Sequence, residues 1–171
     1  MTTTEVSATS KNGVDEYDLS YLEIENKIVR FDMPWVRGDG VHLLVKTATN
    51  ENTEFNEASL RMGGQRRRDI IEGGASLTSD NAKEDREEDR ILYPKYIIVG
   101  WGGIRKKINR DGKIEVVDVP FSRDECAKFI KVLPGWIFDK LRMFCMRPEK
   151  FLDPDDLQEQ REPDAVVVAG N

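Results

Sequence analysis

Residues 96–122 read YIIVGWGGIRKKINRDGKIEVVDVPFS, which combines an apolar run, a glycine cluster, a basic patch and a turn. The stretch is either a strand leading into a phosphate-binding loop or an apolar element followed by a hairpin and a helix. A dinucleotide fingerprint needs a glycine three residues after Gly102, where this chain has Arg105. A P-loop ends in Gly-Lys-Ser/Thr, which is also missing. We therefore expect the hairpin.

The second half of this stretch carries the hairpin signal. Ile104–Ile108 and Ile114–Val119 are β-prone runs, and the turn-forming sequence Arg110–Lys113 separates them. Each run is short and the turn contains Asp-Gly, which is typical of a tight β-hairpin.

A capped helix is expected directly after the hairpin. Ser122 suits the N-cap, Glu125 completes a capping box, and Phe121 faces Cys126 as a hydrophobic staple. Pro134-Gly135 then separates two apolar stripes at helical spacing, so we expect a C-terminal helical hairpin. The stripes consist of Cys126, Phe129, Ile130 and Leu133, and of Ile137, Leu141, Phe144 and Cys145.

Toward the N-terminus, Lys27–Phe31 and Val41–Lys46 are expected to form a short hairpin or two short strands. A helix capped by Asn52 or Thr53 follows, and the pair Gly63-Gly64 inside it favours a division into two shorter helices.

A polar helix is expected next. It begins at Ser79 or Asp80 and ends near Tyr93, because Pro94 kinks or divides a helix. An apolar segment follows and ends at the glycines.

These elements predict a mainly α fold in the α+β class: a small helical domain with one or two short β-hairpins and a C-terminal helical hairpin. The net charge of −6 is uneven, because residues 1–26 and residues 153–171 each carry six acidic residues and one basic residue. We expect a disordered acidic arm at 1–19, one domain at 20–152 and an acidic flexible tail at 153–171.

Composition argues against several classes of function. Acidic pairs lie in charge-rich segments without apolar neighbours, and His42 is the only histidine, so no catalytic, cofactor or metal site is expected. We predict that the protein is not an enzyme. The first ten residues lack a secretory signal and no apolar run spans a membrane, so no membrane partner is expected. Cys126 and Cys145 are predicted to be buried thiols without a disulfide.

Basic and aromatic side chains supply the candidates for interaction. Arg66–Arg68 form one basic patch, and a second lies beside Trp101, where a nucleic-acid base could stack. The overall negative charge disfavours nucleic acid, so we expect an acidic protein partner or the chain's own acidic arms. Large aromatic residues are expected mainly in the core, and any that stay exposed mark a protein interface. The candidates are Trp101, Arg105, Lys106, Lys107, Phe129, Trp136, Phe138 and Phe144.

Residues 41–152 resemble small tail-module proteins of tailed bacteriophages, in particular tail assembly chaperones. The similarity runs from YPKYIIVGWGGI through VPFSRDEC to LPGWIFDKLRMF and PEKF. It is a pattern of capping and packing positions. The doubled Gly102-Gly103 and the insertion at 108–118 depart from it. The matching residues are Trp101, Pro120, Phe121, Ser122, Leu133, Trp136, Phe138 and Phe151.

The resemblance implies a helical adaptor that binds the tape-measure protein, tube subunits or neighbouring virion proteins in the host cytoplasm during assembly. A chaperone of this kind would cover an amphipathic helix until tube subunits displace it. Homo-oligomers are also compatible with it. The alternatives are a structural virion component of the tail or head–tail connection, and a small nucleic-acid-binding protein that uses Trp101, Arg105, Lys106 and Lys107.

Overall fold

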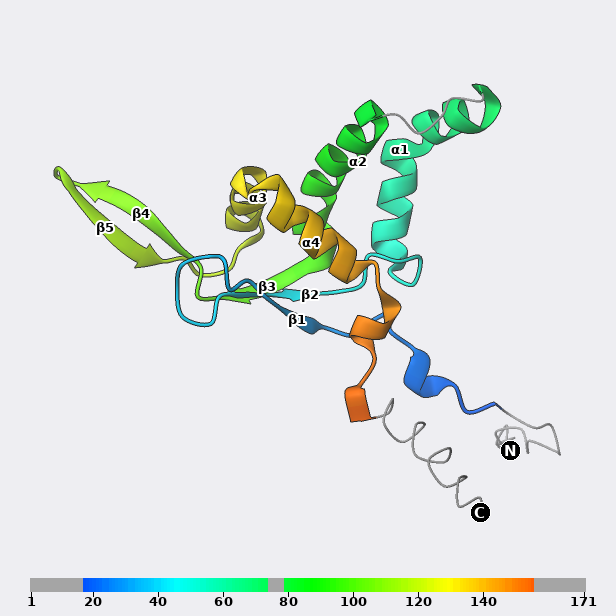
Figure 1. The fold of residues 1–171 in the computed structure, drawn as a ribbon, viewed down its shortest axis with the longest axis horizontal. Coiled ribbons are helices and arrows are strands. Elements are labelled where there is room, and N and C mark those ends of the chain that lie inside the picture. Colours follow the sequence, from blue (N-terminus) through cyan, green and yellow to red (C-terminus); the bar gives the residue numbers. More distant parts are fainter. Residues whose placement is uncertain (1–16, 74–78, 156–171) are drawn as a thin grey trace, which may run out of the picture.

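The computed structural model describes the backbone of residues 17–73 and 79–155, and their side chains except 64–73 and 79–81. Within these residues the chain forms four α-helices and five β-strands in two separate antiparallel sheets (Figure 1). The expected arms at 1–19 and 153–171 lie almost wholly outside the described residues. The side chains of Arg66–Arg68 lie outside them as well.

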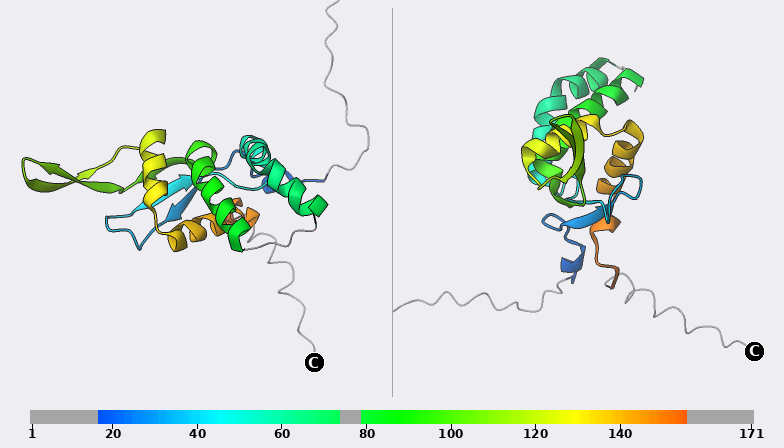
Figure 2. Two further views of the ribbon diagram at one scale, coloured as in Figure 1. Left: turned by 90° about the horizontal axis from the view of Figure 1, so that it is seen from above. Right: turned by 90° about the vertical axis from the view of Figure 1, so that its left-hand side faces the viewer.

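A three-stranded antiparallel sheet forms the base of the domain. Its strands are β1 (Val29–Asp32), β2 (His42–Val45) and β3 (Ile98–Gly102), in that order. In β2, Leu43 and Val45 are fully buried whereas His42 and Leu44 are only partly covered. This alternation turns one face of the sheet toward the helices (Figure 2). The predicted β1–β2 pairing is therefore confirmed, with slightly different ends.

The predicted fold class is wrong, because the domain is α+β with two antiparallel sheets and not mainly α. The difference lies in the apolar run after Pro94, which forms β3. This strand pairs with β2, although two helices separate the two strands in the sequence. A continuous apolar run has no period that separates a buried strand from a buried helix. The run forms a strand because it pairs with β2, whose residues lie more than 50 positions earlier in the chain. Only the tertiary fold therefore decides that this run is a strand.

Two helices connect β2 to β3: α1 (Thr53–Gly73) and α2 (Ser79–Leu92). Asn52 caps α1, since its Oδ1 accepts a hydrogen bond from the N–H of Phe55 at 3.2 Å. The helix continues through Gly63-Gly64, so the expected division does not occur. A π-helical turn at Tyr93–Ile97 (η2) contains Pro94 and ends the helical path, as the proline predicts.

The C-terminal helices are α3 (Arg123–Val132) and α4 (Gly135–Cys145). Ser122 caps α3 as predicted, accepting the N–H of Glu125 at 3.1 Å. The expected helical hairpin is wrong: α3 ends at its C-cap, Leu133, α4 begins after Pro134, and the two helices diverge from this corner instead of running side by side (Figure 2). Buried side chains hold them on different elements: α3 packs on η2 and α2, whereas α4 reaches the sheet through Phe144, whose ring lies 5.1 Å from that of Phe31.

The expected hairpin after the glycines is confirmed. Strands β4 (Arg105–Arg110) and β5 (Lys113–Asp118) pair in register, with Arg110 opposite Lys113. Asp111 and Gly112 have φ values of 51° and 80°, which is the geometry of a two-residue type I′ turn. This ribbon projects away from the body of the domain (Figure 1).

Candidate protein-binding surfaces

Trp101 holds the base of the ribbon to the domain and is only partly exposed. Its indole N–H donates to the carbonyl oxygen of Val119 at 2.8 Å. The ring packs edge-on against Phe121 and Phe129, with centroid distances of 5.3 and 5.6 Å. Phe129, another candidate from the sequence, therefore belongs to this structural cluster.

The basic candidates lie on β4 and do not converge on Trp101. Lys106 pairs with Glu125 of α3, with 3.2 Å between Nζ and Oε1. Arg105 and Lys107 are exposed on the opposite face of the ribbon, since side chains alternate along a strand. Arg105 and Lys107 thus share one face of the ribbon, and Lys106, in its ion pair with Glu125, lies on the other face.

Two of the aromatic candidates on α4 are packed inside the domain. Phe138 is 0% exposed and contacts the ring of Tyr93 and the guanidinium of Arg90. Its expected place on an interaction surface is therefore wrong, and it belongs to the core. Phe144 lies between Phe31 and Phe151 and is only partly exposed. Phe151, which follows α4, returns to the core, where its side chain is 1% exposed.

Trp136 is the candidate that remains at the surface, and Trp35 from the β1–β2 loop joins it. Their side chains are 51% and 45% exposed, and their rings meet edge-on with centroids 5.5 Å apart. The ammonium of Lys140 lies 5.4 Å from the Trp35 ring. Trp136, Lys140 and Met143 follow at helical spacing along α4, and Met143 is exposed. We call Trp35, Trp136, Lys140 and Met143 the tryptophan face.

Sequence reasoning missed Trp35 because loop residues have no periodicity. The only signal was a tryptophan in a Pro- and Gly-rich loop, MPWVRGDG. Its meeting with Trp136, about 100 positions further along the chain, depends on the way α4 packs on the sheet.

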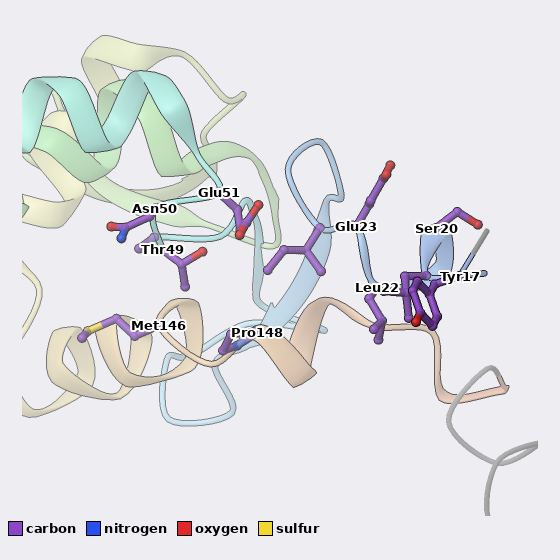
Figure 3. A pocket seen from close by; sticks show the side chains of 12 residues that line it. Tyr17, Ser20, Leu22, Glu23, Thr49, Asn50, Glu51, Met146 and Pro148 are labelled. Atoms are coloured by element: carbon purple, nitrogen blue, oxygen red, sulfur yellow. The ribbon is translucent and has the colours of Figure 1, made fainter. Parts of the chain in front are cut away.

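An open groove of about 920 Å³ lies beyond the C-terminal end of α4. In Figure 3, Tyr17 and Leu22 lie together at one end, and Thr49, Asn50 and Glu51 from the β2–α1 loop lie at the other. Met146 and Pro148 line the side that belongs to the segment after α4, and Met146 is exposed. The lining of the groove mixes apolar side chains with polar ones, among them the carboxylates of Glu23 and Glu51.

The polar groups between α2 and α4 form a structural network. Arg86 donates to both carboxylate oxygens of Asp139, at 2.9 and 2.7 Å, and Arg142 donates to Asp89 at 2.7 Å. The hydrogen bond from Arg86 lowers the pKa of Asp139, whereas burial raises the pKa of Asp89 against the opposing effect of Arg142. Each carboxylate is held by a guanidinium, which is the arrangement of a helix–helix tie.

We expect the Asp139→Asn variant to be less stable than the wild type at neutral pH. The folded pKa of Asp139 is below its unfolded value, so its contribution is complete above about pH 4 and is lost as the pH falls through the folded pKa. The difference in Tm between the two proteins should therefore close in acid. Thermal unfolding followed by circular dichroism from pH 7 to pH 2 measures it. A difference that persists at pH 2 would show that the charge is not its cause.

His42 has a structural role. Its Nδ1 lies 2.6 Å from the carbonyl oxygen of Gly40, and its ring covers the Cα of Gly102 on the neighbouring strand. A general base must lie within hydrogen-bonding distance of a nucleophile, whereas the hydrogen bond of His42 is with the backbone carbonyl of Gly40.

Both cysteines are buried free thiols, which confirms the expectation from the sequence. Burial raises the pKa of Cys126 to about 12 and also raises the pKa of Cys145. The nucleophilic thiolate is therefore scarce at neutral pH.

We expect neither thiol to react with an aromatic disulfide reagent within minutes at pH 8, and both to react at once in 6 M guanidinium, a concentration that unfolds ordinary domains. Absorbance of the released thiolate measures the reaction. One equivalent of fast reaction in the native protein would contradict the burial of one of the two thiols.

Among the side chains that the structure describes, those of residues 17–63 and 82–155, His, Cys, Asp and Glu form no group of three that could hold a metal ion. In the same part of the chain, every helix is too short or too polar to cross a membrane. Comparison of the chain with known proteins found no matching family model, curated protein or solved structure.

Proposed function

We propose that this protein is a non-enzymatic tail assembly chaperone of a tailed bacteriophage. It binds an amphipathic helix of another tail protein, the tape-measure protein first, in the host cytoplasm during virion assembly. The resemblance of residues 41–152 supplies the biological context. The tryptophan face supplies the physical means of binding.

The single observation that carries the proposal is the exposed Trp35–Trp136 pair. Tryptophan is enriched among the few residues that dominate binding energy at protein interfaces. Both rings are about half exposed, so binding a partner removes a large apolar surface from water. These two rings support one another edge-on, so they present a fixed apolar surface and lose little conformational freedom on binding.

The rest of the tryptophan face suits a helical ligand. Met143 extends the apolar surface along α4, and the flexible thioether of methionine adapts to different partner side chains. Lys140 stands among these groups and favours a partner helix that carries a carboxylate beside its apolar stripe. Met146 then leads from α4 into the groove of Figure 3, where a large apolar side chain of the partner fits.

Trp136→Ala should weaken binding of the tape-measure protein at least tenfold, about 1.4 kcal/mol or more, as expected for a central aromatic side chain. Trp35→Ala should act in the same direction. The measurement is co-purification and titration of the full chain with tail proteins of its own phage. Val132→Ala is the matched control, because Val132 is also exposed and apolar but lies on α3 outside the tryptophan face.

Two outcomes would contradict the proposal. If Trp136→Ala and Val132→Ala bind equally well while both keep the wild-type Tm, the tryptophan face is not the binding surface. Mass spectrometry of purified virions beside the infected-cell lysate tests the role. Protein in the lysate and none in particles supports a chaperone, whereas a fixed copy number in particles makes it a structural virion component.

A further inference from the structure

The β4–β5 ribbon exposes apolar side chains that the proposed function does not use. Ile114 and Val116 are 71% and 53% exposed, although both are β-branched and apolar. They lie on one face of the ribbon, opposite Asn109 and Lys107 of β4. An isolated two-stranded ribbon is marginally stable in water, so apolar groups at its outer strand indicate a further strand in the assembled state.

The hydrogen-bond pattern shows which groups of β5 face outward. A tight turn closes with a bond from the first carbonyl to the fourth N–H, so Arg110 and Lys113 form a hydrogen-bonded pair. Pairs alternate along an antiparallel ladder, and the bond from Val119 N–H to the Ile104 carbonyl, 2.9 Å, fits this alternation. The N–H and C=O groups of Ile114, Val116 and Asp118 therefore point away from β4, along the open edge.

The two edges of the ribbon differ in charge. Arg105 and Lys107 stand at the outer edge of β4, where an identical strand would meet like charges, and lysine on an edge strand is a common protection against pairing. The acids of β5 have cationic neighbours on the ribbon itself: Glu115 lies 3.7 Å from Arg110, and Asp118 stands opposite Arg105 in the register. A second identical strand can therefore approach the β5 edge without charge repulsion.

We propose that two copies of this chain associate through the β5 edges of their ribbons and form one four-stranded antiparallel sheet. A two-fold axis perpendicular to this sheet passes between the Val116 residues of the two copies. Ile114 of each copy then lies opposite Asp118 of the other, and the four apolar side chains of Ile114 and Val116 meet on one face. This inference is independent of the proposed function.

The register follows from three requirements. A two-fold axis perpendicular to a sheet keeps each side chain on its own face, so only residues of equal parity lie opposite one another. Only the outward groups of Ile114, Val116 and Asp118 can form the new bonds. Of the two neighbouring symmetric registers, one places Glu115 directly opposite Glu115 of the other copy, which like charge disfavours. The other, centred on Val117, places Ile114 opposite Pro120, which has no N–H to donate. Centring on Val116 avoids both and pairs residues 114–118 fully.

The contact is smaller than the roughly 1,200 Å² buried by stable specific interfaces. Association through the ribbon alone should therefore become visible only at protein concentrations on the order of 100 µM.

Disulfide trapping tests the register directly. We expect Val116→Cys to give a covalent dimer under mild oxidation, because the paired Cα atoms lie about 5.5 Å apart. Ile114→Cys and Asp118→Cys should each give at least tenfold less dimer alone and should crosslink when mixed. The native thiols are buried, so the wild type provides the background.

Sedimentation equilibrium of the full chain gives the second measurement. Val116→Lys should abolish self-association, whereas Asn109→Lys, which adds the same charge on the same face of β4, should leave it unchanged. Equal trapping of Val116→Cys and Ile114→Cys would overturn the register. A chain that stays monomeric at millimolar concentration and is not trapped would overturn the dimer. Loss of tail-protein binding in Val116→Lys, without self-association, would instead assign the edge to a foreign strand.

Discussion

Phe138→Ala is expected to lower the free energy of unfolding by about 3–5 kcal/mol, the usual loss when a buried aromatic side chain is truncated. Phe138 is 0% exposed, and its ring lies 5.4 Å from that of Tyr93 and 4.8 Å from the guanidinium carbon of Arg90. Truncation removes a contact shared by α4, α2 and η2. Natural domains have only about 5–15 kcal/mol of stability, so this variant is close to the limit for folding.

Urea denaturation followed by circular dichroism measures this loss. Met143→Ala is the matched control, because Met143 is on the same helix but exposed, and its truncation should change stability by less than about 0.5 kcal/mol. If Phe138→Ala kept wild-type stability and lost tail-protein binding, Phe138 would be an interaction residue after all.

The second large effect is expected for Gly103→Ala. Gly103 has a φ of 74°, and a Cβ there would lie 2.7 Å from the carbonyl oxygen of Asp39 and 3.1 Å from the Cα of Val41. Both neighbours are backbone atoms of the β1–β2 loop, which cannot move without disturbing β2. Left-handed strain of about 1–2 kcal/mol and the steric overlap add, so we expect a loss of about 2–4 kcal/mol.

Gly112→Ala separates these two causes. Gly112 has a φ of 80° but open space around the position of a Cβ, so the strain of about 1–2 kcal/mol should act alone. Thermal and urea unfolding of both variants gives the comparison. Equal losses would mean that the close approach of Gly103 to the Asp39 carbonyl does not contribute.

Three local signals of this chain, a cap, a turn and a proline, predicted the structure correctly, whereas the pair Gly63-Gly64 did not divide α1. Ser122 caps α3 because its side chain reaches an N–H three residues away, and Asp111-Gly112 forms the turn because these residue types tolerate positive φ. Pro94 ends α2 for an equally local reason, its missing N–H. In the same way, the apolar spacing of α3 and α4 identified both helices.

The candidate site was only partly predictable. Helical spacing marks Trp136 and Phe138 equally, yet one stays exposed and the other is buried, because the two side chains point in different directions from α4. Trp101 stood beside cations in the sequence, but its indole N–H donates to the carbonyl oxygen of Val119, directly after β5 at the base of the ribbon. Trp35 carried no periodic signal at all.

The amino-acid sequence by itself thus determined the cap of α3, the end of α2 and the turn of the ribbon, since caps, prolines and turn residues act within a few residues. The pair Gly63-Gly64, by contrast, did not end α1. Only the tertiary structure decided that the apolar run at 98–102 is a strand, since its partner β2 lies more than 50 residues earlier. It also decided that Trp35 meets Trp136 and that the β5 edge stays open. These outcomes depend on contacts between distant segments, whose energies appear only when packing brings the segments together.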